Sequence, residues 1–289
     1  MTIAITGATG QLGRLVLSAL LRLDVPREQL VAAGRSREKL RSLRELELTT
    51  ARIDYGDPAS LDAAFDGADA VLLISSSEVG SRVDQHRNAV EAAVRTGVGR
   101  LVYTSALGAD RGKLLLADEH LATEELVTGS GLPWTIVRNG WYTENFEPAV
   151  HYAAETGLVL SNAGDGRVTS ATREDYAEGL AAVLAQDGHA WQTYELSGDD
   201  AWDHDELAAT LTRVLGREVV HRRLSPEQHL AALEESGVDE ATARFLVALD
   251  ANIEDGALDL VTGDLSRLIG RPTTALEQAL RTIAGDSYV

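Results

Sequence analysis

Three glycines, Gly7, Gly10 and Gly13, constrain this chain more than any other feature of its sequence. They follow the apolar segment Ile3–Thr6 directly and open the amphipathic segment Gln11–Arg22. Glycine permits a tight turn, lets a ligand approach the backbone, and allows a strand and a helix to pack closely. The helix that begins there offers unpaired amide groups and a partial positive charge to an anion. The spacing therefore predicts a loop that binds the diphosphate of a dinucleotide. Its predicted contacts are Gly7, Thr9, Gly10, Gln11, Leu12 and Gly13.

Strand-like and helix-like segments alternate through the first half of the chain. The strands are predicted at Ile3–Thr6, Leu30–Ala33, Thr49–Ile53, Ala70–Ser75, Leu101–Thr104 and Thr135–Arg138. The amphipathic segments between them are Gln11–Arg22, Arg37–Leu43, Ala59–Phe65, Val83–Arg95 and Ala117–Gly129. Several strands are continuous apolar runs, as expected for strands buried on both faces of a parallel sheet. The alternation predicts an α/β fold with a doubly wound parallel sheet of the Rossmann type.

The rhythm changes after Gly140. A turn-rich stretch at Asn162–Gly166 precedes a predicted helix at Glu174–Ala185 and a predicted strand at Thr193–Leu196. Further helices are predicted at Glu206–Leu215, Pro226–Ser236, Ala241–Leu249 and Thr274–Ile283. We therefore expect a dinucleotide-binding domain over residues 1–140, with a returning segment near 168–198. A smaller, helix-rich substrate-binding lobe is expected over residues 141–289.

The formal net charge of −19 opposes binding to a nucleic-acid backbone. The charge is uneven, because residues 1–52 hold nine Lys and Arg against five acidic residues. Such an excess is expected on a solvated helix face or beside a phosphorylated ligand. The sequence leaves both interpretations open.

Composition excludes several other functions. The chain has no cysteine, which rules out disulfides and thiolate chemistry. Its seven histidines show no paired metal-ligand spacing, and no G-x-S-x-G motif predicts a serine hydrolase. The start of the chain lacks a leader pattern, and apolar stretches such as Leu15–Leu21 are far shorter than the roughly 20 residues that span a bilayer. We expect a cytoplasmic enzyme without a metal site or a membrane anchor.

Arg35 directs the choice of cofactor. NAD-binding folds usually place an acidic residue at the end of the second strand, where it binds the ribose 2′-hydroxyl. Here that strand ends in Gly34 and Arg35, and Arg37 and Lys39 follow. A guanidinium suits a 2′-phosphate, so the sequence predicts NADPH. Arg37 and Lys39 fit a solvated helix start equally well.

The carboxyl ends of the remaining strands supply further candidates for the cofactor cleft, because ligands bind there in such sheets. They are Asp54, Tyr55, Ser75, Ser76, Ser77, Thr104, Ser105, Asn139, Gly140, Trp141 and Tyr142. Asp54 and Tyr55 are equally consistent with a simple turn. Trp141 and Tyr142 could stack on a planar substrate or pack between lobes.

The usual proton donor of short-chain dehydrogenases, a Tyr with a Lys four residues later, is missing. The lysines are Lys39 and Lys113, and neither follows a tyrosine by four residues. His120 stands near the corresponding helix position and is a candidate proton donor. Tyr142 is the other candidate. A half-buried structural role for His120 stays the alternative.

Motifs along most of the chain resemble those of a known family. They are Ala4–Gly13, Asp54–Asp57, Leu72–Gly80, Gln85–Asn88, Ala117–His120, Arg138–Tyr142, Ala163–Gly166 and Leu268–Thr274. In these segments the sequence resembles the NmrA-like, atypical short-chain dehydrogenases, most closely the bacterial NADPH-dependent quinone oxidoreductases of type 2. Trp191, Trp202 and the helices after Glu218 have no role assigned by the likeness.

The resemblance implies an NADPH-dependent reductase that converts quinones to quinols. It also implies that Arg35 binds the 2′-phosphate and that Ser75–Ser77 and Asn139–Tyr142 line the cleft. Hydride transfer to a quinone generates a comparatively stable aromatic anion, which fits the missing Tyr–Lys pair. The alternatives are a reductase of ketones, imines or azo compounds, and a regulator that senses NADP without turnover. Whether the chain forms a homodimer is left open.

Overall fold

Seven parallel strands form the central sheet of this protein. The structure is a computed structural model and describes residues 1–76, 78 and 80–285. The strands are β1 (Ile3–Ile5), β2 (Leu30–Gly34), β3 (Thr49–Arg52), β4 (Ala70–Leu73), β5 (Arg100–Ala106), β6 (Trp134–Asn139) and β8 (Gln192–Leu196). Their order across the sheet is β3-β2-β1-β4-β5-β6-β8, so the predicted doubly wound fold is confirmed.

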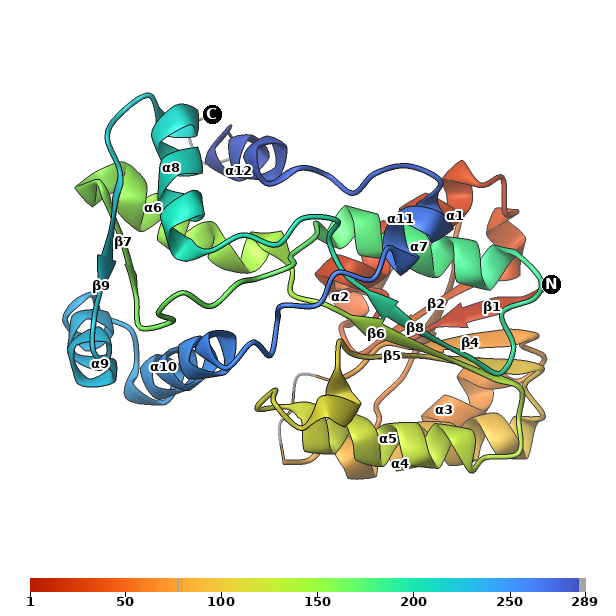
Figure 1. Cartoon of the computed structure of the whole chain (residues 1–289). Coiled ribbons are helices and arrows are strands. Elements are labelled where there is room, and N and C mark those ends of the chain that lie inside the picture. Colours follow the sequence, from red (N-terminus) through yellow and green to blue (C-terminus); the bar gives the residue numbers. More distant parts are fainter. Residues whose placement is uncertain (77, 79, 286–289) are drawn as a thin grey trace.

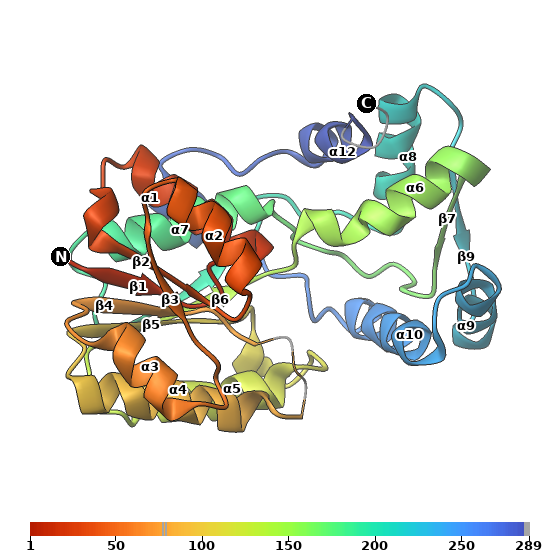
Figure 2. The ribbon, with the colours of Figure 1, turned by 180° about the vertical axis from the view of Figure 1, so that it is seen from behind.

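Helices cover both faces of the sheet (Figures 1 and 2). One face carries α1 (Gln11–Arg22), α2 (Arg37–Glu45) and α7 (Arg173–Ala185). The other carries α3 (Pro58–Phe65), α4 (Arg82–Thr96) and α5 (Ala117–Thr128). Because β1 and β4 are neighbours while the chain winds outward from them in both directions, their carboxyl ends flank the crevice in which such folds bind ligands.

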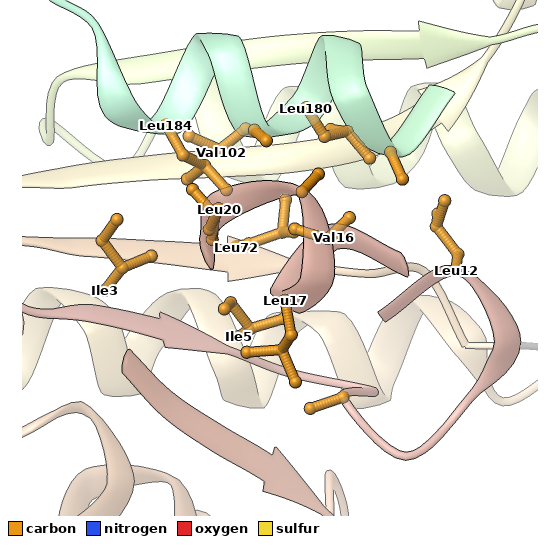
Figure 3. Close-up of a cluster of buried hydrophobic side chains, with 14 of the residues drawn as sticks. Ile3, Ile5, Leu12, Val16, Leu17, Leu20, Leu72, Val102, Leu180 and Leu184 are labelled. Atoms are coloured by element: carbon orange, nitrogen blue, oxygen red, sulfur yellow. The ribbon is translucent and has the colours of Figure 1, made fainter. Parts of the chain in front are cut away.

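The core between α1, α7 and the sheet is entirely aliphatic at its centre. Figure 3 shows Val16 and Leu20 of α1 together with Leu180 of α7 above Leu72 of β4. These four side chains are fully buried, and burial of each contributes roughly 1.5–3 kcal/mol. The packing fixes the start of α1 against β1, which is where the glycine loop lies.

The returning segment completes this half of the molecule. β8 pairs with β6 in register from Thr135 to Asn139. A short helix absent from the sequence prediction, α11 (Asp264–Ile269), packs its Leu265 against Gly179 of α7. A β-carbon at Gly179 would lie 2.9 Å from that side chain. The chain therefore returns to this half of the molecule twice after residue 140, first with α7 and β8 and then with α11. The division at residue 140 stays a prediction.

The second lobe holds a small parallel sheet that the sequence prediction missed. Its strands are β7 (Leu158–Ser161) and β9 (Val220–Arg223). Around them lie α6 (Glu147–Thr156), α8 (His204–Leu215), α9 (Pro226–Glu235), α10 (Glu240–Glu254) and α12 (Leu276–Gly285). Trp202 is 4% exposed and meets Phe146 edge-on at 4.9 Å between ring centroids. That contact gives Trp202 a place in the core of the lobe. In the part of the chain that is described, no helix is long and apolar enough to cross a membrane.

Candidate active site

The glycine loop forms a cradle of backbone atoms at the carboxyl end of β1. Gly7 has a φ of +61°, a left-handed conformation that side chains rarely adopt. The amide of Gly10 donates to the carbonyl of Gly7 at 2.9 Å, which closes the turn. A β-carbon at Gly13 would lie 2.4 Å from the Gly7 carbonyl oxygen. The first turn of α1 can approach β1 this closely only without side chains, and the resulting amide-lined bend fits a diphosphate.

A groove of about 370 Å³ runs along this bend and the ends of β2 and β4. It brings together many of the predicted contacts, namely Gly7, Thr9, Gly10, Arg35, Tyr55, Ser75 and Ser76. Gln11 and Leu12 lie behind the loop in the first turn of α1, where Leu12 joins the core. The groove spans the switch point between β1 and β4, so its place matches the expected crevice.

The Tyr55 hydroxyl connects three strands across the floor of the groove. It lies 2.7 Å from the Thr6 hydroxyl and 2.9 Å from the Ile74 carbonyl oxygen. Burial raises the pKa of the Tyr55 phenol well above its ordinary value. Asp54 behaves differently, because its carboxylate accepts the Gly56 amide at 2.9 Å and closes the turn after β3. The structure therefore places Tyr55 in the groove and Asp54 beside it.

Arg35 stands at the β2 end of the groove, directly after that strand. Its guanidinium lies 2.5 Å from the Glu78 carboxylate, and 65% of its side chain is exposed. Hydrogen bonds from Gln85 and Arg35 hold the pKa of Glu78 below its usual range. Ser36 caps α2 by accepting the Lys39 amide at 3.3 Å. Arg35 is thus an exposed cation beside the start of α2 that is already paired with Glu78, and its contact with a 2′-phosphate stays a prediction.

The segment after β4 is held from below by buried side chains. The Ser75 amide donates to the Thr104 hydroxyl at 2.9 Å, and the Ser76 amide donates to Nε2 of His86 at the same distance. Burial is the main cause that lowers the pKa of His86 to about 3, so the ring stays neutral and can accept. The Thr104 hydroxyl therefore holds the backbone of Ser75 in place beside the groove. The predicted contact Ser77 lies outside the described residues.

His120 belongs to a buried group that we call the histidine cluster, formed by Arg82, His86, Tyr103 and His120. Its Nδ1 lies 2.9 Å from the Tyr103 hydroxyl, and its Nε2 lies 3.5 Å from the Arg82 guanidinium. Burial, then the charge of Arg82, lowers the pKa of His120 to about 4. Arg82 in turn donates to the Ser76 carbonyl at 2.7 Å. Both ring nitrogens thus face protein groups, and the ring is not among the groove-lining residues of the described chain. Its catalytic role stays a prediction.

A second buried group, the arginine cluster, supports the carboxyl ends of β5, β6 and β8. Arg138 forms ion pairs with Glu124 at 2.7 Å, Glu195 at 2.7 Å and Asp110 at 2.8 Å. These carboxylates raise the pKa of Arg138 far above its ordinary value. Ser105 donates to Glu124 at 2.5 Å, so this predicted cofactor contact is engaged inside the cluster. The cluster joins three adjacent strands to α5 at one sheet edge.

Asn139 carries a buried acceptor that nothing satisfies. The residue is 7% exposed, and its Oδ1 has no hydrogen-bond partner within the described structure. A buried polar atom without a partner costs about 1–3 kcal/mol, so it marks a place for a ligand donor. Because β6 is two strands from β4, Asn139 lies roughly 10 Å along the same edge from the groove. The orphaned oxygen fits the carboxamide amino group of a nicotinamide.

The residues after Asn139 close this edge toward the second lobe. A β-carbon at Gly140 would lie 2.7 Å from the Tyr176 hydroxyl, which explains the glycine. Trp141 packs against the core of the second lobe. The Tyr142 ring lies 4.8 Å beneath the Arg173 guanidinium, and burial raises the pKa of its phenol. Trp141 therefore contributes to packing between the lobes, while Tyr142 stays half-buried at the edge.

Comparison with known proteins decides the family. A model of the NAD(P)H-binding family matches residues 7–187. The chain belongs to this family. Among its relatives, quinone oxidoreductase 2 of Escherichia coli is 45% identical over 278 residues, which are 96% of this chain and 97% of that protein. The resemblance stated from the motifs is confirmed, and the chain carries an NAD(P)H-binding domain.

Two solved structures of family members match almost the whole chain. The NADPH complex of the NADPH-dependent quinone oxidoreductase from Escherichia coli has a TM-score of 0.94 and 44% identity, over 98% of this chain and 100% of that one. The triphenylmethane reductase of Citrobacter sp. with NADP(H) has a TM-score of 0.94 and 37% identity, with the same coverage. The family fold thus extends through the second lobe.

Sequence reasoning did not single out every residue of the groove. It left out Gly34, Ser36, Ile53 and Ile74, and it kept Lys39 open. A signal existed for Ser36, since serine before an amphipathic run is a strong helix cap. Glu78 gave none, because its ion pair with Arg35 joins residues 43 positions apart.

Proposed function

We propose that this protein transfers a hydride from NADPH to a quinone and releases the quinol. The observation that carries the proposal is the glycine cradle with Arg35 at the end of β2, where an NAD-specific fold has an acidic residue. NADPH supplies the hydride when it is bound. The cradle and the N-terminus of α1 would hold its diphosphate, Arg35 its 2′-phosphate, and Asn139 its carboxamide.

The weakness of the available acids supports a quinone as the acceptor. With a pKa of about 4, the His120 imidazole is neutral at pH 7, and the Tyr142 phenol has a raised pKa. Neither group offers a proton readily. A quinone that accepts a hydride becomes the hydroquinone monoanion, which takes its proton from water. Positioning and exclusion of side reactions are then the main contributions of the protein.

Stopped-flow mixing of the NADPH-loaded protein with 1,4-benzoquinone tests the activity. We expect the NADPH absorbance to fall in a single turnover and the quinol to accumulate. A triphenylmethane dye is the second acceptor in the trial, because a relative at 37% identity is a triphenylmethane reductase. Faster reduction of the dye would show that the acceptor class is wrong. No turnover with quinone, dye, ketone, imine or azo compound would favour an NADP-sensing regulator.

Arg35→Ala tests the choice of cofactor. A charge-assisted hydrogen bond is worth about 1.5–3 kcal/mol, so the variant should bind NADPH roughly 10- to 100-fold more weakly and bind NADH unchanged. Arg222→Ala, an exposed arginine of the second lobe, is the matched control and should alter neither. Equal loss for both cofactors would contradict a 2′-phosphate contact.

The assembly and the location stay predictions. We infer a homodimer from a groove between α4 and α5, in which Val90, Val94 and Leu126 are flanked by charged side chains. Sedimentation velocity of the wild type and of Val94→Asp tests it, and a monomeric wild type would exclude it. A cytoplasmic location and the lack of nucleic-acid binding are expected from the sequence, and a filter-binding assay with DNA tests the second.

A further inference from the structure

A second, strongly basic pocket lies beside the cofactor groove. It has a volume of about 330 Å³ and is lined by Arg37, Arg41, Arg44 and Arg52 around Leu40. Three of the arginines come from one face of α2, and Arg52 ends β3. Four guanidiniums around one hollow repel each other. Such a cluster of positive charge also contrasts with the formal net charge of −19 of the whole chain.

The charges of this pocket are not neutralised locally. Arg37, Arg41 and Arg52 form no ion pair within residues 1–76, 78 and 80–285, and Arg44 bonds only to the neutral Thr50 hydroxyl, at 2.7 Å. Several arginines of the second lobe behave differently. Arg213, Arg223 and Arg244, for example, each pair with a carboxylate. The acidic residues on and just after α2 are Glu38, Glu45 and Glu47, so the basic segment from Arg35 to Arg52 keeps a positive balance.

The pocket adjoins the β2 end of the groove. Arg52 pairs in register with Gly34, the residue before Arg35. On α2, Lys39 lines the groove while Arg37 and Arg41 line the pocket. The two hollows therefore lie next to each other, on neighbouring parts of α2.

The solvent exposure of the four arginines limits how tightly this pocket can bind an anion. All four arginines are exposed, and an exposed ion pair is worth only about 0–1 kcal/mol because water screens it. The pocket is therefore poorly suited to tight binding. Clustered charges do act at a distance, however, and can raise association rates with a charged ligand by about 10- to 1,000-fold.

We propose that this arginine pocket is an encounter site that attracts the phosphorylated end of NADPH and sets its association rate. The ligand is a dinucleotide with three phosphate groups, approaching a protein whose net charge repels it. The pocket supplies local attraction at the mouth of the groove, and Arg35 takes over the 2′-phosphate once NADPH is seated. The proposal rests on NADPH binding at the groove, and it is independent of the acceptor.

Stopped-flow binding of NADPH to the full chain, followed by quenching of tryptophan fluorescence, measures the two rates separately. We expect Arg37→Gln/Arg41→Gln to associate about three- to tenfold more slowly at low salt with an unchanged dissociation rate. The difference should vanish near 1 M salt, where the Debye length falls to about 3 Å. NADH, which lacks the 2′-phosphate, should show a smaller difference.

The control is Arg222→Gln/Arg244→Gln, which removes the same charge from the second lobe. An equal slowing in this control would assign the effect to net charge and overturn the proposal. A wild-type association rate that is indifferent to salt would overturn it as well. So would a faster dissociation with unchanged association, since that result indicates direct contact with bound NADPH. A chain that binds NADPH but reduces no quinone would refute the proposed function and leave this inference intact.

Discussion

The two ends of the candidate cofactor site differ in whether backbone or side-chain atoms form them. At the glycine-loop end the ligand-facing atoms belong to the backbone, and Gly13 permits the approach of α1 to β1. At the carboxyl ends of β5, β6 and β8, by contrast, buried polar side chains form a network, with Arg138 held by Glu124 and Glu195. The first end is local in sequence. The second joins residues 14 and 57 positions apart.

The difference predicts how each end fails. An added β-carbon at the glycine loop collides with the protein's own backbone, so the loop and the start of α1 must shift. Stability then falls, and binding falls further because the amides that would hold the diphosphate are displaced. Removal of one charge from the arginine cluster leaves another charge buried without a partner, so stability should suffer first. For the variants at the two ends, we compare the free energy of unfolding with the binding or use of NADPH. A variant of the arginine cluster that weakens binding more than stability would contradict this difference between the two ends.

Arg138→Met should have the largest effect. It leaves Glu124, whose side chain is 9% exposed, without its cation, and breaking a buried pair costs about 3–5 kcal/mol. Urea unfolding measures the loss. Arg244→Met is the matched control, because its exposed pair with Glu240 should cost under about 1 kcal/mol. Equal losses in the two variants would show that the arginine cluster is not a buried charge network.

Gly13→Ala should weaken NADPH binding by about 100-fold or more while the protein stays folded, because the new β-carbon would lie 2.4 Å from the Gly7 carbonyl oxygen. Gly10→Ala is milder, since its β-carbon would lie 3.2 Å from the same atom. Isothermal titration of both variants tests the order. If Gly10→Ala were the more damaging, the close approach of α1 would not be the controlling feature.

Asn139→Leu should separate the two quantities at the second end. The substitution removes a buried acceptor that lacks a partner, together with a long 3.4 Å hydrogen bond to the Tyr142 hydroxyl, so the free energy of unfolding should fall by less than about 1 kcal/mol. Hydride transfer should slow about tenfold, because the nicotinamide loses one hydrogen bond worth about 1–1.5 kcal/mol. Single-turnover kinetics with NADPH and benzoquinone, beside urea unfolding, provide the readouts. Unchanged kinetics would exclude a contact between Asn139 and the carboxamide.

The histidine cluster gives an effect of a different kind, a pH dependence of stability. His120 has a folded pKa of about 4, below the unfolded value of about 6.5, so the unfolded chain binds this proton more readily. Its contribution to stability is fully present above pH 6.5 and is lost as the pH falls toward 4. In His120→Gln, the slope of unfolding free energy against pH in that range should be smaller by about 1 kcal/mol per pH unit. Identical slopes would indicate that folding does not lower the pKa of the His120 ring.

Much of the sheet could be predicted because its strands are buried on both faces. β4, for example, is an uninterrupted run of apolar residues with every position buried. β7 and β9 escaped prediction for the opposite reason. β9 reads Val-His-Arg-Arg, with three of its four residues exposed or charged at the edge of a two-stranded sheet. Nothing in its pattern reports the partner strand about 60 residues earlier in the chain.

The sequence by itself determined the glycine loop, the α/β alternation and the cation at the end of β2, because these features depend on neighbours within a few residues. Only the tertiary structure decided which polar side chains are buried together. Ser105 was a candidate contact and lies in the arginine cluster, and Glu78 gave no signal and faces Arg35. The physical reason is that the energy of a buried charge depends on partners brought to it by strand order, and strand order is not local.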